Sequence, residues 1–445
     1  METEHPPPQR RAWLWVPSLY FSEGVPNTIV TTMSVVMYKR LGISDGDITF
    51  FVSCLNLPWV LKPLWSPWVD TRRTKRFWIV AMQLAATAGL ALAALSILTP
   101  VFFKLSLFLF LTIAFASATH DIAADGFYMM GLSKHDQAWW VGLRNTFYRV
   151  AMTFGGGWLV VMAGRLERTS GNIPVAWSAA LFTAAGVFLL FSLWHWWILP
   201  RPVADAPVAE AFDRRGEVKG ADRGLLSEFT AAFGSFFKKP GVWLTLAFIL
   251  LYRLDEAQVS KVIPLFLLNP RDKGGLGLTA GDSGLIYGLW AVPALTFGGL
   301  AGGFLAAKFG LKKMIPIMAC SMYLPKLAYI GLSLARPENF GVICGAVALE
   351  QFGYGFGFTA FMLYLLYFSD GPRRTAHYAI CTGFMTLGLM IPGMWSGKLA
   401  SAMGYPAFFT WVLCSALPGL IIALSLKIEP QYGQKTGNSL QSKRD

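Results

Sequence analysis

Charged residues are scarce in this chain of 445 residues, where Asp, Glu, Lys and Arg together make up 14%. An ordinary soluble domain has about 25% of these residues. The deficit extends along the whole chain, which excludes both a soluble globular protein and a soluble body held by one anchor. Hydrophobic residues make up 54%, and the mean hydropathy is +0.48. This composition predicts an all-α protein that crosses a membrane many times.

Cysteines are few, and catalytic motifs are lacking. The five cysteines lie singly in apolar stretches without CxxC or Cys/His spacing, so neither a disulfide framework nor a metal site is expected. No Walker A, HExxH or GxSxG pattern occurs, which argues against ATP-driven transport within this chain and against catalysis. We therefore expect a protein that is not an enzyme and has no cofactor.

Apolar spans of about 20 residues, the length that crosses the hydrocarbon of a bilayer, recur about twelve times. They predict an all-α bundle of transmembrane helices. The predicted spans lie near residues 13–37, 47–69, 77–99, 103–130, 137–164, 175–199, 241–268, 279–306, 313–335, 339–369, 375–402 and 406–427.

Basic residues give the chain a formal net charge of +13, and they concentrate in alternate turns between the spans. Examples are Arg72-Arg73-Thr74-Lys75-Arg76 and Lys312-Lys313. The positive-inside rule explains this pattern without a nucleic-acid partner, and it predicts that both termini and the middle linker are cytoplasmic. We expect a monomer in a bacterial inner membrane.

A short repeat divides the chain into two halves. The segment Leu41-Gly42-Ile43-Ser44-Asp45-Gly46-Asp47 precedes the second span, and Leu276-Gly277-Leu278-Thr279-Ala280-Gly281-Asp282 precedes the eighth. Two six-helix halves with a cytoplasmic linker are the layout of the major facilitator superfamily, with pseudo-two-fold symmetry. The predicted parts are an N-terminal bundle (1–199), a linker ending in an amphipathic helix (200–240), a C-terminal bundle (241–430) and a disordered tail (431–445). The amphipathic helix either lies flat on the membrane or acts as a structural strut.

Ionisable side chains at membrane depth cost roughly 2.5–3.5 kcal/mol or more, so each needs a partner or a task. The fourth span carries His120, Asp121 and Asp125, and the fifth carries Arg144 and Arg149. Equal distances from the connecting turn predict the pairs Asp125–Arg144 and Asp121–Arg149. These pairs are either static clamps or links that open when a solute or proton arrives.

The first span holds Glu23, followed by Pro26 and Asn27, which interrupt the helix. Glu23 is either a proton carrier or part of an ion pair with Lys62 or with an arginine of the fifth span.

The seventh span combines Arg253, Asp255, Glu256 and Lys261, and two acids with two bases at this depth predict an aqueous cavity or several partners. In the ninth and tenth spans, Lys326 and Glu350 match in depth and predict a structural salt bridge. Aromatic residues follow in the tenth span, where Tyr354 and Tyr364 either stack on a solute or fill space. His195, among tryptophans at the end of the sixth span, is interpreted as part of an interfacial belt.

Three segments carry a resemblance to a known family. They are Lys62-Pro63-Leu64-Trp65-Ser66-Pro67-Trp68-Val69-Asp70, Ser22-Glu23-Gly24-Val25-Pro26 and Ala118-Thr119-His120-Asp121-Ile122-Ala123-Ala124-Asp125, with Gly142 and Tyr148-Arg149 in support. The chain resembles the AmpG-type muropeptide permeases of the major facilitator superfamily, although Glu23 stands where that family has a small residue. The resemblance implies proton-coupled import and a functional weight for Asp121, Asp125 and Arg149.

The prediction is therefore a secondary transporter that imports an anionic, cell-wall-derived sugar peptide with protons. A siderophore or other metabolite permease is the alternative within the family, and a ligand sensor is the alternative outside transport. The proposed solute-binding residues are Asn27, Lys62, His120, Arg144, Tyr148, Arg149, Arg253, Gln351, Tyr354 and Tyr364. The proposed proton-coupling residues are Glu23, Asp121, Asp125, Asp255, Glu256 and Glu350.

Overall fold

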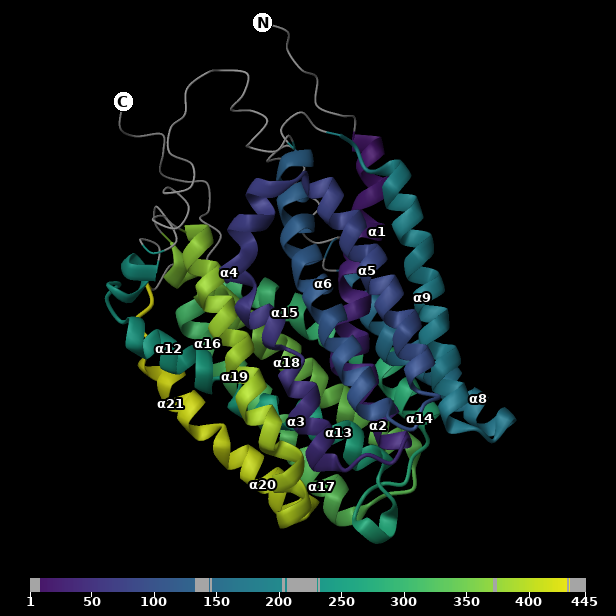
Figure 1. Cartoon of the computed structure of the whole chain (residues 1–445). Helices are drawn as coiled ribbons and strands as arrows, with labels where there is room; N and C mark the ends of the chain where they lie inside the picture. The colour runs from purple at the N-terminus through teal and green to yellow at the C-terminus, as the bar shows by residue number, and fades with distance from the viewer. Residues whose placement is uncertain are drawn as a thin grey trace, which may run out of the picture.

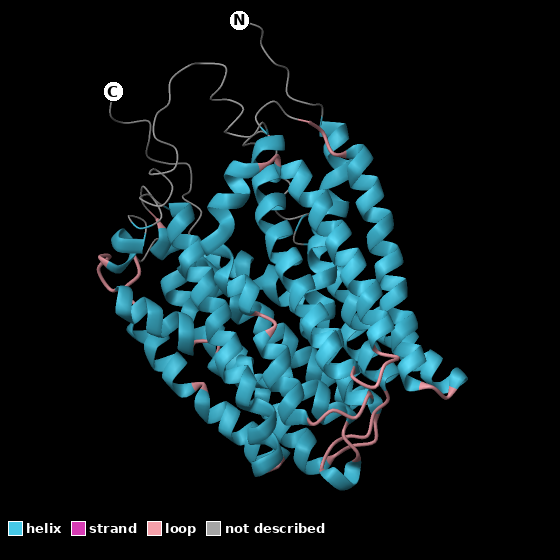
Figure 2. Cartoon of the chain, in the orientation of Figure 1, coloured by secondary structure: helices cyan, strands magenta, loops and turns pink. Residues whose placement is uncertain are grey.

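The protein is a bundle of long helices, and the part of the chain described by the computed structural model contains no strand (Figure 2). The structure describes residues 9–132, 144, 146–201, 205, 230, 233–370, 374–429 and 432. The start of α1 and the end of α9 lie at the same end of the bundle, at the top of Figure 1, which we call the α1 end. The opposite end, where α2 meets α3, is called the far end.

The first half of the chain supplies α1, α5, α6, α8 and α9, which lie on the right of Figure 1, and α3 and α4, which run through its middle. The bounds of the helices in this half are α1 (Gln9–Thr28), the π-helix η1 (Ile29–Met33), α2 (Ser34–Arg40), α3 (Asp45–Cys54), α4 (Leu57–Arg72), α5 (Lys75–Ser96), α6 (Phe102–Gly131), the π-helix η2 (Thr153–Trp158), α8 (Leu159–Ser170) and α9 (Ile173–Ile198).

The second half has a matching series of helices. Their bounds are α12 (Val242–Leu251), α13 (Leu254–Leu268), the 3₁₀-helix η4 (Arg271–Lys273), α14 (Ala280–Leu285), the π-helix η5 (Ile286–Ala291), α15 (Val292–Phe309), α16 (Leu311–Tyr323), the 3₁₀-helix η6 (Leu324–Lys326), α17 (Leu327–Ala335), α18 (Phe340–Ser369), α19 (Arg374–Met403), α20 (Tyr405–Ser415) and α21 (Leu417–Ser425).

Among the described residues, nine helices are long and apolar enough to cross a membrane. The other three predicted spans are less regular. Span 13–37 contains Glu23 and the π-helix η1, span 241–268 breaks between α12 and α13, and span 137–164 begins in residues outside the description. The predicted fold class, a multi-pass α-helical membrane protein, is confirmed.

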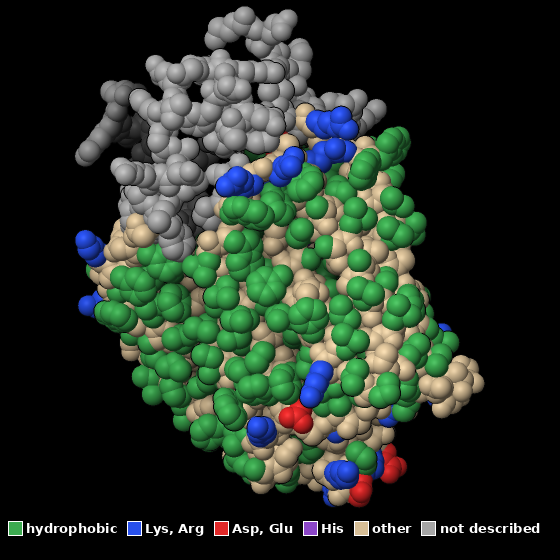
Figure 3. Space-filling view, viewed as in Figure 1, with side chains coloured by type: hydrophobic (Ala, Val, Ile, Leu, Met, Phe, Trp, Pro, Cys, Tyr) green, Lys and Arg blue, Asp and Glu red, His purple; other side chains and the backbone are tan. Residues whose placement is uncertain are grey.

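The molecular surface has the pattern of a membrane protein. In the view of Figure 3, hydrophobic side chains cover the middle of the described surface, and Lys and Arg gather near the α1 end. Acids and bases are mixed at the far end in this view. This asymmetry agrees in direction with the positive-inside rule.

The repeat noticed in the sequence is a repeated helix start. Ser44 accepts a hydrogen bond from the backbone N–H of Asp47 at the start of α3. Thr279 and Asp282 form the same arrangement, as a full capping box, at the start of α14. Side-chain caps of this kind satisfy the free N–H groups at a helix start. The two halves therefore begin their second spans in the same way.

Each half has its own apolar cores. Side chains such as Tyr38, Phe110 and Trp177 fill a core of the first half, and Phe248, Tyr252 and Phe361 fill a core of the second. The end of the linker packs into the second half, because the ring of Phe236 is buried against Phe368 and His377. This contact agrees with a strut, whereas residues 206–229 of the linker lie outside the described residues.

The halves meet along a seam of glycines at which the π-helices η2 and η5 pack together. A Cβ on Gly284 would lie 2.8 Å from the carbonyl oxygen of Gly157 and 2.9 Å from the backbone nitrogen of Val161. Real Cβ atoms do not approach backbone atoms this closely, so only glycine permits the contact.

The variant Gly284→Ala should consequently force the two halves apart, at a cost of about 1–3 kcal/mol from overpacking. We expect a lower thermal unfolding temperature for the purified protein in detergent. Gly303→Ala is the matched control, since a Cβ at Gly303 meets nothing within 4 Å. Equal unfolding temperatures for the two variants would show that the seam is not tightly packed.

Candidate functional site

Asp125 and Arg144 form an ion pair between α6 and the helix that runs into η2. The carboxylate Oδ1 of Asp125 lies 3.2 Å from Nη1 of Arg144, and it also accepts a 3.2 Å hydrogen bond from the hydroxyl of Tyr20. The guanidinium of Arg144 stacks on the Tyr20 ring at 4.7 Å. This predicted pair is confirmed. The side chain of Asp125 is 41% exposed, so water reaches this part of the bundle.

Asp121 pairs with Lys62 of α4, and the predicted Asp121–Arg149 pair is wrong. The depth of Asp121 in the bundle agrees with the prediction. However, α4 also packs against α6 and places Lys62 at the same depth. The Lys62 ammonium therefore takes the position beside Asp121 that the prediction gave to Arg149. Arg149 faces the other half.

Glu23 is the acid without a base of its own. It lies within electrostatic reach of Asp121, Asp125 and Arg144, and its side chain approaches Asp121 at hydrogen-bonding range. Its Oε2 atom is buried, with no hydrogen-bond partner among the described residues. Three acids thus face two bases in this group, which we call the N-terminal acid cluster (Glu23, Asp121, Asp125, Lys62 and Arg144). Two carboxyl groups can share a hydrogen bond only if one of them holds a proton.

Removal of Lys62 should upset this cluster, because Asp121 would keep its charge without its partner. We expect Lys62→Met to lower uptake at least tenfold, since breaking a partly buried pair leaves an uncompensated charge. The double variant Lys62→Met with Asp121→Asn removes both charges and should recover folded protein to the parent yield. A double variant no better folded than the single variant would mean that Lys62 acts independently of Asp121.

A second group of acids lies in the C-terminal half around Lys326. The Nζ atom of Lys326 is 2.9 Å from Asp255, 3.3 Å from Glu256 and 3.7 Å from Glu350. The side chains of all four residues are 0–5% exposed. The predicted Lys326–Glu350 pair is confirmed within this C-terminal acid cluster (Asp255, Glu256, Lys326 and Glu350), which contains three acids and one base.

Hydrogen bonds complete this cluster only in part. Glu350 accepts from Tyr329 at 3.1 Å and from Gln351 at 2.9 Å. Both carboxylate oxygens of Asp255 have no hydrogen-bond partner in the described part of the chain, although one of them faces the Lys326 ammonium. Three ionised carboxylates on one ammonium would leave two uncompensated charges in a dry site, where charge burial is very costly.

Two arginines without an acid partner converge on Tyr354 of α18. Arg253 contacts the Tyr354 hydroxyl and lies 4.6 Å above the ring of Phe358. Arg149 reaches across from the first half: its charge interacts with Tyr354, and its Nη2 lies 3.4 Å from where a Cβ on Gly299 would be. Neither arginine forms an ion pair with an acid in the described ranges.

Lys261 of α13 is a third such cation, and the solute-binding residues predicted from the sequence did not include it. Its Nζ donates a 3.2 Å hydrogen bond to the backbone carbonyl of Thr31, within the π-helix η1 of the other half. Pro26 lies just before η1, and proline disrupts the regular backbone hydrogen bonding of a helix. The signal that points to Lys261 is a base in an apolar span with no acid one helical turn away.

The remaining predicted residues divide between the centre and the bundle interiors. Asn27 and Tyr148 are half-buried, and Tyr148 packs beside Gly24. Tyr364 is buried in the core of the second half and hydrogen-bonds Thr245 at 2.9 Å, so it does not belong to the solute site.

His120 is buried and hydrogen-bonds Gln83 at 3.0 Å. His195, interpreted as an interfacial residue, is also fully buried, and that interpretation is wrong.

At the far end the two halves are joined by polar contacts. Asp45 pairs with Lys39 at 2.6 Å and accepts a 2.7 Å hydrogen bond from Asn269 of the other half. Thr49 accepts a 3.1 Å hydrogen bond from the backbone of Gly397. Asp125, the most exposed acid of the N-terminal cluster, lies in the last turns of α6 nearer the α1 end, whereas these polar contacts close the far end.

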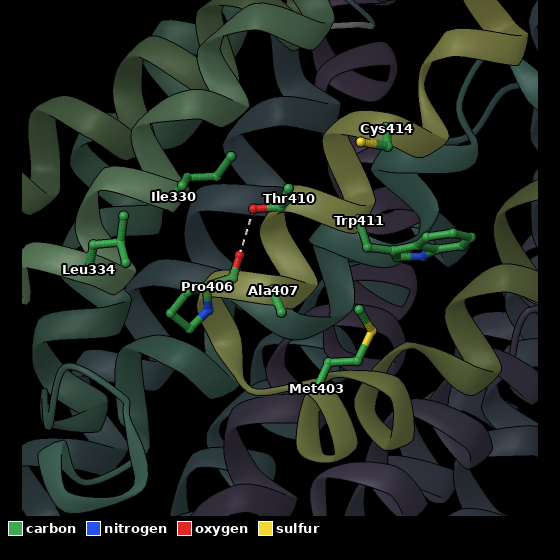
Figure 4. Close-up of a pocket in the computed structure, with 8 residues that line it drawn as sticks. All are labelled: Ile330, Leu334, Met403, Pro406, Ala407, Thr410, Trp411 and Cys414. Carbon is green, nitrogen blue, oxygen red and sulfur yellow. Dashed lines mark hydrogen bonds between the residues drawn. The ribbon is translucent and has the colours of Figure 1, made fainter.

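A groove on the outer face of α17 and α20 has a volume of about 450 Å³. The close-up in Figure 4 shows that its lining is apolar apart from Thr410, whose hydroxyl is bonded to the carbonyl oxygen of Pro406 at 2.9 Å. Leu334 and Trp411 in this lining are well exposed on the molecular surface. The groove offers no charge to a solute, and it is unrelated to the central clusters.

Comparisons with known proteins agree with this arrangement. The chain is 27% identical over 423 residues to "Putative transporter AmpG 4" of Rickettsia felis, with 91% of this chain and 93% of that protein covered. It is 24% identical over 427 residues to "Anhydromuropeptide permease" of Escherichia coli K12, with coverage of 94% and 80%. No family model matches the chain.

Among solved structures, the crystal structure of a D-xylose–proton symporter superposes with a TM-score of 0.67 at 13% identity, and covers 93% of this chain and 96% of that one. The fold is therefore that of the major facilitator transporters. The resemblance to AmpG-type permeases extends over nearly the whole chain, and these relatives are named as transporters and permeases. The chain therefore has the fold of a multi-pass membrane transporter, and the relatives that it resembles are named as transporters and permeases, not as enzymes.

Proposed function

We propose that this transporter imports an anionic, cell-wall-derived sugar peptide of the anhydro-muropeptide kind together with protons. The single observation that carries the proposal is the separation of charge at the centre of the fold. Acids exceed bases in both acid clusters, whereas Arg149, Arg253 and Lys261 have no carboxylate partner in the described chain. A solute anion bound by the free cations, together with protons bound by the excess acids, would neutralise the positive and the negative groups at the same time.

The chemistry of the free cations supports an anionic solute. A guanidinium holds a carboxylate through two parallel hydrogen bonds, and a desolvated site strengthens them. Arg149 and Arg253 come from opposite halves and both lie beside Tyr354. A carboxylate between them would link the two halves, as a substrate at the midplane of such a fold should do. The N-acetylmuramyl sugar carries a lactyl carboxylate of this kind.

The excess acids support coupling to protons. Glu23 is the acid beyond those that Lys62 and Arg144 neutralise, and it approaches Asp121. It lies in the span interrupted by Pro26 and η1, next to the other half. We propose Glu23 as the first proton site, with Asp255, Glu256 and Glu350 holding two further protons in the dry cluster.

The relatives' names support the choice of solute, because one of them is called an anhydromuropeptide permease. The basic surface near the α1 end supports a cytoplasmic position for both termini. In that orientation the closed far end faces the periplasm. The solute then enters when the hydrogen bond between Asp45 and Asn269 breaks and the two halves come together at the α1 end.

Uptake into liposomes tests this proposal. Purified protein is reconstituted into vesicles with an alkaline interior, and labelled anhydro-muropeptide is added outside at acidic pH. We expect the solute to accumulate above its external concentration, and a protonophore to abolish that accumulation. Accumulation of a ferric siderophore in its place would identify the other permease class, and binding without uptake of either would indicate a sensor.

A further inference from the structure

Four hydrogen-bonded side chains cross the interior of the N-terminal bundle beside the acid cluster. Nε2 of His120 on α6 lies 3.0 Å from Nε2 of Gln83 on α5. The Gln83 amide contacts Nδ1 of His195 on α9, at 2.8 Å from its nitrogen and 3.0 Å from its oxygen. Nε2 of His195 then lies 2.9 Å from the hydroxyl of Ser18 on α1. We call this series the imidazole chain.

Three of the four members of the imidazole chain are buried. His195 and Gln83 are 0% exposed and His120 is 3% exposed, whereas Ser18 is half-buried. Burial of the three polar groups is costly unless their hydrogen bonds are satisfied, and a half-satisfied network is worse than an apolar core. One group is left open: Nδ1 of His120 is buried with no hydrogen-bond partner among the described residues.

The Gln83 amide can face His120 in two ways. If its NH₂ group faces the ring, Nε2 of His120 accepts, so His120 carries its proton on Nδ1. If its carbonyl oxygen faces the ring, Nε2 of His120 donates, and Nδ1 of the neutral ring has no proton. Nδ1 of His195 contacts both amide atoms, so it can accept or donate in either arrangement. A rotation of one amide therefore fixes which nitrogen of His120 can accept a proton.

In the second arrangement the open Nδ1 of His120 carries a free lone pair. His120 precedes Asp121 in the chain, and the two groups interact electrostatically. Asp121 in turn interacts with Lys62 of α4 and with Glu23 of α1, and His195 interacts with His120. Protonation of His120 would place a cation beside Asp121 and would favour its ionised form.

We propose that the imidazole chain sets the protonation state of His120, which accepts a proton from the site at Asp121 and Glu23. The step moves one proton from a carboxyl of that site to Nδ1 of His120, leaving a carboxylate and an imidazolium whose Nε2–H donates to the Gln83 oxygen. This inference rests on the proposed coupling to protons.

Nitrogen NMR of protein labelled with ¹⁵N-histidine tests the inference without any transport measurement. The signals of His120 and His195 are assigned with the variants His120→Gln and His195→Gln. In the parent, His120 should be locked in one tautomer at neutral pH. Gln83→Glu, whose ionised carboxylate offers only acceptor oxygens, should keep His120 charged to a pH about one unit higher or more. Gln83→Met, which offers no hydrogen bond, should give a mixture of tautomers.

Ser178→Ala is the matched control, because Ser178 on α9 hydrogen-bonds the Ala94 carbonyl of α5 at 2.8 Å and joins the same two helices. It should leave the His120 signals unchanged. In uptake assays the pH midpoint should move in Gln83→Glu and stay in place in Ser178→Ala. An unlocked tautomer in the parent, or a His120 titration that is equal in Gln83→Glu and in the parent, would overturn the inference. That result would leave proton-driven uptake itself intact.

Discussion

Replacement of Lys326 by Met will leave the protein largely unfolded or inactive. Among the residues that the structure describes, Lys326 is the one base within 4.0 Å of Asp255, Glu256 and Glu350, and all of these side chains are nearly inaccessible to solvent. Removing one partner of a buried ion pair typically costs about 3–5 kcal/mol, because the other charge remains buried and unpaired. The purified variant should unfold at a much lower temperature, with no measurable uptake.

Lys398→Met is the control for this prediction. Lys398 also lies in a membrane helix, but it is exposed, its ammonium lies over the rings of Phe50 and Trp395, and its stem packs beside Gly46. The Lys398→Met variant should fold normally. Glu350→Gln should also fold well, since the cluster has more acids than Lys326 can neutralise. An equal loss of stability in Glu350→Gln and Lys326→Met would show that every acid in the cluster is needed in its charged form.

The second large effect is expected at Arg253, whose guanidinium lies over the ring of Phe358 and contacts Tyr354. Arg253→Met should raise the KM for the anionic solute about 30-fold or more, since loss of a buried charged partner costs about 2–5 kcal/mol. Arg253→Lys keeps the charge but loses the fork-shaped donor set, and it should recover only part of the affinity.

Lys308→Met provides the comparison for Arg253. The Nζ atom of Lys308 lies 5.3 Å from the centre of the Phe309 ring at the end of α15, so Lys308→Met loses a similar cation–π contact away from the centre of the fold. The KM of this variant should match that of the parent. If Arg253→Met binds the solute as tightly as the parent does, the cationic site does not hold the anion, and the assignment of Arg149 and Arg253 fails.

Much of the architecture followed from the sequence because it depends on length and polarity along the chain. Apolar spans, their turns and the repeated helix start at Ser44 and Thr279 are local features. The Asp125–Arg144 and Lys326–Glu350 pairs also followed, since two helices joined by a short turn fix the depth of each residue.

Contacts between helices that are distant in the sequence could not be predicted in this way. Depth does not determine which neighbouring helix faces a residue, so the pairing of Asp121 with Lys62 was missed. For the same reason Tyr364 was placed in the solute site although it faces the core. His195 was read from its tryptophan neighbours in sequence, whereas Gln83 on α5 decides its environment.

The central claim is that a solute anion and protons enter together through this charged centre. The direct test is to enclose a pH-sensitive dye in proteoliposomes without an imposed gradient and to add anhydro-muropeptide outside. The parent should acidify the lumen as the solute enters, and Glu23→Gln should exchange labelled solute without acidification. Solute entry in the parent with no change in luminal pH would contradict the account.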